Sequence, residues 1–316
     1  MTKISQPYDL FFKELLSRPE RAGTLLRERL PREVVQFLSA KPPELVPGSF
    51  VEEQLRERRS DRLYRVETIS GKTAFLYVLI EHKSTPDEKV GWQLLKYMGE
   101  ILRQWEKENQ NWKHLPAIVP FVFYHGSEEW KTPNEFVHLV DAEEAWRPYL
   151  LNFRFPVLDL GKIPDKDLSE DRRLYPWLLV MKYATRANQQ MSIRELLIEA
   201  LRAVPEDLFP IVFYLVQTYV YDEQMLRGII REVRPEEEER MMSQFAQDIR
   251  KTARQEALIE GEVKGEAKLL LGLLSHRFQS LPNEVSKRVH SANPNDIETW
   301  ARRVLDAKSL DEVFSE

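Results

Sequence analysis

Residues 74–83 read AFLYVLIEHK, an apolar run of strand-forming residues that ends in titratable ones. A continuous run of this kind predicts a strand that is buried on both faces of a sheet. Side chains two positions apart on a strand share a face, so we expect Glu81 and Lys83 to project together and His82 to the other side. Because unpaired charge is costly to bury, the end of this strand is also a candidate functional site.

The segment before this run completes a predicted hairpin. Residues 61–69 read as extended chain, and Ser70-Gly71-Lys72 is a turn signal. Closing the hairpin at this turn places Asp61 opposite Glu81, and cross-strand neighbours lie about 5 Å apart. A slip of one residue would move Asp61 to the other face. In the predicted register, two carboxylates and the Lys83 ammonium group meet at one end of the hairpin.

Helices and two further strands are expected around this hairpin. Before the hairpin, the pattern predicts a helical segment over 8–30 that is broken at Pro19, a second helix over 31–40 and a proline-rich loop over 41–48. After the hairpin, it predicts a long helix over 89–108, a buried strand over 117–124 with Pro120 as an irregularity, and a short edge strand over 157–160. From about residue 170 the periodicity is almost entirely helical, with one helix ending near Gly261. Together these elements predict an α/β fold, in which a small sheet lies within a mostly helical chain.

Composition excludes several classes of protein. The 316 residues contain no cysteine, which excludes disulfide scaffolds, cysteine nucleophiles and thiolate metal sites. No apolar run approaches the ~20 residues of a membrane helix, and the N-terminus has no apolar signal core, so we expect a cytoplasmic protein without a membrane partner. The net charge of −5 argues mildly against a dedicated nucleic-acid-binding domain, although an enzyme can touch DNA through a small local patch.

The predicted carboxylate pair points to a divalent metal. Two close carboxylates repel each other unless a cation neutralises them, and Mg²⁺ or Mn²⁺ prefers oxygen ligands. Such a metal lowers the pKa of a bound water and neutralises charge on a phosphoryl group, while Lys83 would orient the water or stabilise the transition state. This arrangement suits hydrolysis of a phosphodiester. From the residues alone, a structural ion-pair cluster of Asp61, Glu81 and Lys83 is as well supported as a metal site.

Longer stretches of the chain resemble a known family. Asp61 lies 20 positions before Glu81, Lys83 follows two positions later, and a predicted helix and strand come next. This arrangement resembles the PD-(D/E)XK nuclease core, although Ser60 replaces its proline. Roughly residues 5 to 260 resemble the Rpn family of recombination-promoting nucleases, also labelled YhgA-like transposases. The resemblance is carried by stretches such as YDLFFKELLSRPERA (8–22), LYVLIEHKSTPDEKVGWQLLKYM (76–98) and IVPFVFYHGSEEWKTP (118–133). The resemblance implies a restriction-endonuclease-like core with a small central mixed sheet flanked by helices, followed by an all-helical C-terminal region.

The resemblance also implies an activity and the residues that carry it. It implies an Mg²⁺-dependent (or Mn²⁺-dependent) DNA endonuclease that is linked to recombination or mobile DNA. The positions that match the family's site are two metal-binding carboxylates, the motif lysine and a supporting glutamine: Asp61, Glu81, Lys83 and Gln93. Three further positions are accessory candidates: Asp9, Lys13 and Glu52.

Other readings of the same residues stay open. Arg58, Arg59 and Arg62 could contact a DNA backbone, but the basic run is interleaved with glutamates, so a solvated helix face is at least as well supported. A non-catalytic DNA-binding or oligomerisation protein built on a nuclease fold is the alternative to the enzyme. The apolar stripe over 269–278 is either packing within a small domain or a helix–helix dimer seam, and we slightly favour a homodimer.

The expected domain organisation has three parts. A nuclease-like core occupies residues 1–165, a helical extension 166–260, and a small helical C-terminal domain 261–316. The last part resembles a helical domain of unknown function that is often appended to such proteins.

Overall fold

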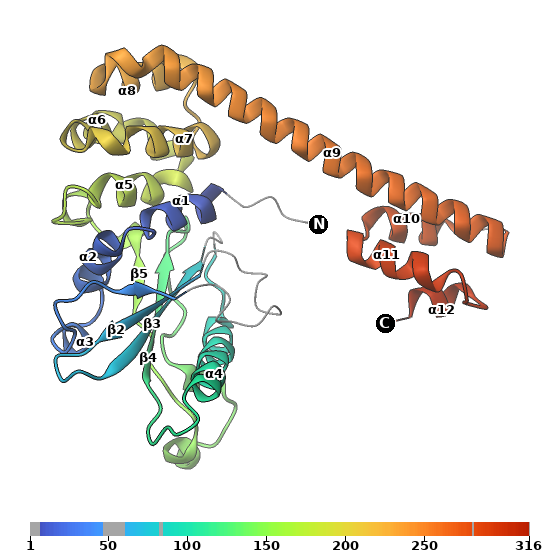
Figure 1. The fold of residues 1–316 in the computed structure, drawn as a ribbon, viewed down its shortest axis with the longest axis horizontal. Helices are drawn as coiled ribbons and strands as arrows, with labels where there is room; N and C mark the ends of the chain where they lie inside the picture. The colour runs from blue at the N-terminus through green and yellow to red at the C-terminus, as the bar shows by residue number, and fades with distance from the viewer. Residues whose placement is uncertain (1–6, 47–60, 82–84, 280, 316) are drawn as a thin grey trace. The chain divides into compact units, whose positions relative to one another are not determined.

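The computed structural model describes residues 7–46, 61–81, 85–279 and 281–315 (Figure 1). Its sheet has five strands, β1 to β5, which lie in chain order and span Glu44–Leu45, Arg62–Glu67, Thr73–Glu81, Ala117–Tyr124 and Val157–Asp159. β1, β2 and β3 pair antiparallel, whereas β3, β4 and β5 pair parallel. The sheet is therefore mixed, and the predicted α/β class is confirmed.

Helices form most of the remaining described chain. The α-helices α1 to α12 span Pro7–Leu15, Pro19–Arg29, Arg32–Val35, Val90–Glu108, Tyr175–Ala184, Arg194–Ala203, Leu208–Thr218, Glu223–Val233, Glu238–Phe278, Asn283–Ser291, Pro294–Arg303 and Leu310–Phe314. Short 3₁₀ helices, η3 to η9, span Phe136–Leu139, Glu144–Tyr149, Leu160–Lys162, Asp165–Asp167, Ala187–Ile193, Pro205–Asp207 and Pro235–Glu237. No helix in these residues is both long enough and apolar enough to cross a membrane.

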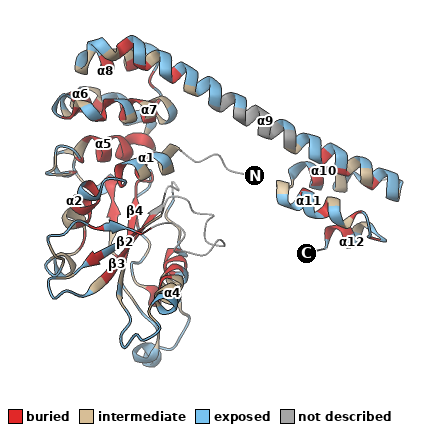
Figure 2. Ribbon diagram, in the orientation of Figure 1, coloured by how far each residue is buried: buried red, intermediate tan, exposed pale blue. Residues whose placement is uncertain are grey.

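The two faces of the sheet are covered by different helices (Figures 1 and 2). Phe75 and Tyr77 of β3 share a buried cluster with Leu94 of α4, so α4 covers one face. On the other face the ring of Phe12, in α1, lies 4.6 Å from the ring of Phe123, in β4. β3 is consequently buried on both faces, as its continuous apolar sequence predicts.

The hairpin has a register that differs from the predicted one by two positions. Glu67 pairs with Thr73 and Arg62 with Val78, so position 61 is level with residue 79 and not with Glu81. The predicted register was wrong because Ile69 does not pair across the hairpin; its N–H donates to Phe37 O. Since strand side chains alternate, a shift of two positions leaves Asp61 on the face that we expected.

The chain before β2 is less helical than predicted. The helix expected over 31–40 is only the short α3, because Leu38 forms a β-bridge with Thr68 and Ser39 N–H donates to Glu67 O. Likewise, the loop expected over 41–48 contains β1, which pairs with β2. Residues that the local pattern assigned to a helix and a loop therefore pair with the edge of a strand instead.

Pro120 is accommodated inside β4 because of the direction in which its nitrogen points. The N–H of Val122, two residues later, donates to Pro156 O on the β5 side of the strand. The nitrogen of Pro120 points to the same side, where β5 pairs only with residues 122–124. The missing N–H therefore costs no hydrogen bond within the sheet.

The described chain divides into two compact units, one ending at Glu239 and the other beginning at Arg240. In the second unit, the predicted helix end near Gly261 is wrong, because α9 continues to Phe278. A glycine in a helix costs about 1 kcal/mol but does not end it unless the chain adopts a left-handed cap there. Leu270 and Leu274 of the apolar stripe pack inside this unit, whereas Leu269 is 66% exposed.

A buried ion pair joins α2 to η8. Arg21 Nη2 lies 2.5 Å from Asp207 Oδ2, and both side chains are at most 4% exposed. Trp177 Nε1 donates to the same carboxylate at 2.9 Å. Each charge is therefore satisfied only while the other is present.

We expect Arg21→Ala to lower the free energy of unfolding by about 3–5 kcal/mol, because it leaves the Asp207 carboxylate buried without its counter-ion. Urea denaturation followed by circular dichroism measures this loss. Lys41→Ala, which removes an exposed ion pair with Glu67, is the control and should cost no more than about 1 kcal/mol. Equal losses in the two variants would contradict the prediction.

Candidate functional site

The predicted site residues fall partly within the described structure. Asp61 directly precedes β2 and is half-buried. Glu81 is the last residue of β3, where its backbone is in register with Tyr124 of β4. Four predicted residues lie outside the described residues: Lys83, Glu52, Arg58 and Arg59.

Asp61 is held by a side chain of the central strand. Tyr77 of β3 donates its hydroxyl hydrogen bond to Asp61 Oδ2 at 2.5 Å. The Tyr77 side chain is only 3% exposed, and its ring stacks on Tyr97 of α4 with 5.0 Å between ring centroids. The carboxylate is therefore fixed on the α4 face, close to the end of β3. Sequence reasoning missed Tyr77, since it counted the residue only as part of an apolar run.

Gln93 reaches the same face from α4. It lies one helical turn before Tyr97, so both side chains project from one side of the helix. Gln93 is 8% exposed, and among the described residues its Nε2 atom has no hydrogen-bond partner. A buried amide without a partner costs free energy, and such groups often belong to functional sites. The structure therefore brings the predicted glutamine to the face that also holds Asp61.

Asp9 and Lys13 approach the sheet from its other face, because both lie on α1. The ring of Tyr8, next to Asp9, lies 5.2 Å from the ring of His125, which follows β4. Burial raises the pKa of Tyr8 above its usual value. The start of α1 thus lies by the end of β4, and the accessory role of Asp9 and Lys13 stays a prediction.

Arg62 belongs to β2 and is half-buried. By strand alternation it shares a face with Tyr64, whose hydroxyl donates to Leu16 O at 2.9 Å after α1. Burial lowers the pKa of the Arg62 guanidinium, an effect that the neighbouring Tyr64 and Asp61 partly oppose. Arg62 therefore lies in the sheet and not on an exposed helix face, and its contact with DNA stays a prediction.

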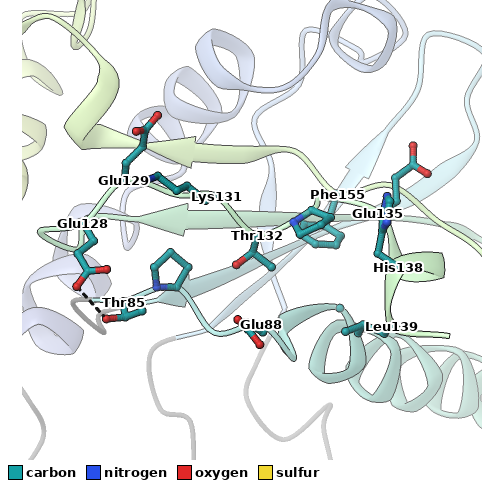
Figure 3. Close-up of a pocket in the computed structure, with 13 residues that line it drawn as sticks. Thr85, Glu88, Glu128, Glu129, Lys131, Thr132, Glu135, His138, Leu139 and Phe155 are labelled. Carbon is teal, nitrogen blue, oxygen red and sulfur yellow. Dashed lines mark hydrogen bonds between the residues drawn. The ribbon is translucent and has the colours of Figure 1, made fainter. Parts of the chain in front are cut away.

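A cleft of about 420 Å³ lies beside the end of β3 (Figure 3). Its walls come from the chain before α4, the loop after β4, and η3. On one side Thr85 Oγ1 donates to Glu128 Oε1 at 3.2 Å, as the dashed line in Figure 3 marks. The sequence did not reveal this cleft, because its walls are far apart in the chain.

Acidic groups dominate the lining of the cleft. Glu88, Glu128, Glu129 and Glu135 line it with a single lysine, Lys131. Hydrogen bonds from Lys162 to Glu129 and from Arg154 to Glu135 lower the pKa of each carboxyl group, so both are ionised at neutral pH. Glu129 and Glu135 are thus paired with cations, which leaves Glu88 and Glu128 beside Lys131 in the lining. Within the described residues, no three His, Asp or Glu side chains are grouped to hold a metal ion.

Comparison with known proteins settles which family the chain resembles. The pattern of the family described as "Putative transposase, YhgA-like" matches residues 6–207, well over half of the chain. The chain belongs to this family. The resemblance inferred from the quoted sequence stretches is thereby confirmed.

Several relatives carry names that refer to nucleases. Recombination-promoting nuclease RpnD of Escherichia coli O157:H7 is 28% identical over 249 residues, which cover 76% of this chain and 92% of RpnD. Recombination-promoting nuclease RpnC of Escherichia coli K12 is 31% identical over 196 residues, 60% of this chain and 62% of RpnC. The inactive recombination-promoting nuclease-like protein RpnE of the same strain is 26% identical over 281 residues, 87% of this chain and 92% of RpnE. No solved structure matches the chain.

We expect Gln93→Leu to raise the free energy of unfolding by about 1 kcal/mol, because an apolar side chain removes a buried amide nitrogen that has no partner among the described residues. Urea denaturation compares it with the native chain. Gln104→Leu on the same helix removes an amide that donates to Glu108, and it should change stability by no more than about 0.5 kcal/mol. A clear loss of stability in Gln93→Leu would overturn the expectation.

Proposed function

We propose that this protein is a divalent-metal-dependent DNA endonuclease that hydrolyses phosphodiester bonds on a PD-(D/E)XK core. The observation that carries the proposal is the placement of Asp61, which Tyr77 holds on the α4 face of the strand that ends in Glu81. Gln93 lies buried on the same face. Family membership and the names of RpnD and RpnC support a nuclease that acts in recombination or on mobile DNA.

The donor chemistry of this region fits Mg²⁺ or Mn²⁺. Asp61 offers a carboxylate that is held in place, and the buried Gln93 Nε2, which has no partner among the described residues, can donate a hydrogen bond to a water or a phosphate oxygen beside the metal. Hard cations of this kind take oxygen ligands from carboxylates, amides and water. A bound metal would supply an activated water and neutralise charge on the phosphate.

Each residue of the proposed site has a separate task. Asp61 and Glu81 would hold the metal, and Lys83 would orient the attacking water or stabilise the charge that develops on the phosphate. Gln93 supports the site from α4. The accessory candidates are Asp9, Lys13 and Glu52, and the candidate phosphate contacts are Arg58, Arg59 and Arg62. The substrate is DNA, and the location that we propose is the cytoplasm.

The alternative function is a DNA-binding or oligomerisation protein without catalysis. The relative RpnE favours this alternative, because it aligns with 87% of this chain and is named as inactive. We also propose that the protein is a homodimer, a state that many nucleases with one site per subunit need in order to cut both strands. The exposed Leu269 of the C-terminal unit is consistent with such an interface.

Cleavage of plasmid and linear duplex DNA tests the enzyme directly. We expect the native chain to cut with Mg²⁺ or Mn²⁺ and not with EDTA, because the metal activates the water. Asp61→Ala and Lys83→Ala should each lower the rate at least ~100-fold, because each removes a group that acts in the transition state. Gel electrophoresis of the products measures these rates.

The control is Glu236→Ala, which removes an exposed carboxylate of η9 and should leave the rate unchanged. Circular dichroism verifies that every variant is folded. A folded native chain that cuts no DNA favours the non-catalytic alternative. Metal-dependent cutting that survives both site substitutions overturns the assignment of the site.

A further inference from the structure

The contact between Tyr77 and Asp61 connects the most buried strand of the sheet to the candidate metal site. The Tyr77 hydroxyl lies 2.5 Å from Asp61 Oδ2. A hydroxyl that donates to a carboxylate over so short a distance makes a strong, charge-assisted hydrogen bond. Such a bond restricts rotation of the carboxylate as well as stabilising its charge.

Tyr77 is itself fixed in place by its surroundings. Its backbone pairs with Leu63 on one side and with Pro120 on the other. Its ring stacks on Tyr97 with 29° between the ring planes, and the side chain is 3% exposed. The hydroxyl oxygen therefore has little freedom to move, and it defines one position for Asp61 Oδ2.

Asp61, by contrast, lies just outside the regular sheet, because β2 begins at Arg62. A side chain at a strand end samples several rotamers unless another group selects one. The hydrogen bond from Tyr77 selects that rotamer. Partners of this kind orient metal ligands, and their removal typically costs 10- to 100-fold in metal affinity.

We propose that Tyr77 is a positioning residue, which holds Asp61 Oδ2 so that the carboxylate is oriented in advance to bind a divalent cation. This inference rests on the proposed function, since it assigns a partner to the metal-binding carboxylate of that site. Tyr77 acts through Asp61 and takes no part in the chemical step.

Isothermal titration calorimetry with Mn²⁺ on the full-length chain tests the proposal without any measurement of cleavage. We expect Asp61→Asn to abolish the binding event, and Tyr77→Phe to weaken it about 10-fold while its fold is retained. Tyr64→Phe is the matched control. It removes a buried tyrosine hydroxyl from the neighbouring strand, where the hydroxyl donates to Leu16 O, and it should leave Mn²⁺ affinity unchanged within about twofold.

The outcomes separate the two proposals. Binding that depends on Asp61 but is equally tight in Tyr77→Phe overturns the positioning role and leaves the metal site intact. Mn²⁺ binding that is absent, or that survives Asp61→Asn, overturns the proposed metal site itself, and the positioning role with it. Equal weakening in Tyr77→Phe and Tyr64→Phe would mean that loss of any buried hydroxyl loosens the sheet, and it would also overturn the positioning role.

A double-mutant cycle in urea examines the hydrogen bond without metal. If the bond orients Asp61, the shift in the unfolding midpoint of the Tyr77→Phe, Asp61→Ala double variant is smaller than the sum of the two single shifts, because alanine removes the acceptor. Strictly additive shifts overturn the inference. This measurement remains decisive if Tyr77→Phe proves too unstable for calorimetry.

Discussion

The structure depends on the burial of β3, a strand that has neighbours on both edges and helices on both faces. A buried backbone must pair nearly all of its N–H and C=O groups, so β3 can exist only between β2 and β4. Its side chains are apolar on both faces, and they in turn require α4 on one side and α1 on the other. The end of β3 is therefore the point at which a strand covered on both faces reaches the titratable residues 81–83 of the sequence.

This arrangement explains how a flexible carboxylate can be held precisely. Asp61 is outside the regular sheet, yet it is anchored by Tyr77, a residue in the middle of the central strand. Functional groups that are supported by rigid elements keep their geometry better than groups on loops.

Several features were predictable because they follow from local pattern. β3, β4, β5 and α4 lie where apolar runs and helical periodicity place them, and the break at Pro19 separates α1 from α2. The predictions were wrong where the backbone forms hydrogen bonds with a segment that is distant in the sequence. Ile69 was expected in the hairpin but donates to Phe37 O, and the helix expected over 31–40 is shortened by a bridge between Leu38 and Thr68.

The sequence alone therefore determined the family, the order and type of most elements, and the glutamine of α4 as a site candidate. Only the tertiary structure decided that Asp61 is level with residue 79, that Tyr77 donates a hydrogen bond to it, and that the Gln93 amide is buried. The physical reason is the range of the interactions. Periodicity and turn chemistry act over a few residues, whereas strand register and side-chain partners depend on how segments far apart in the chain pack together.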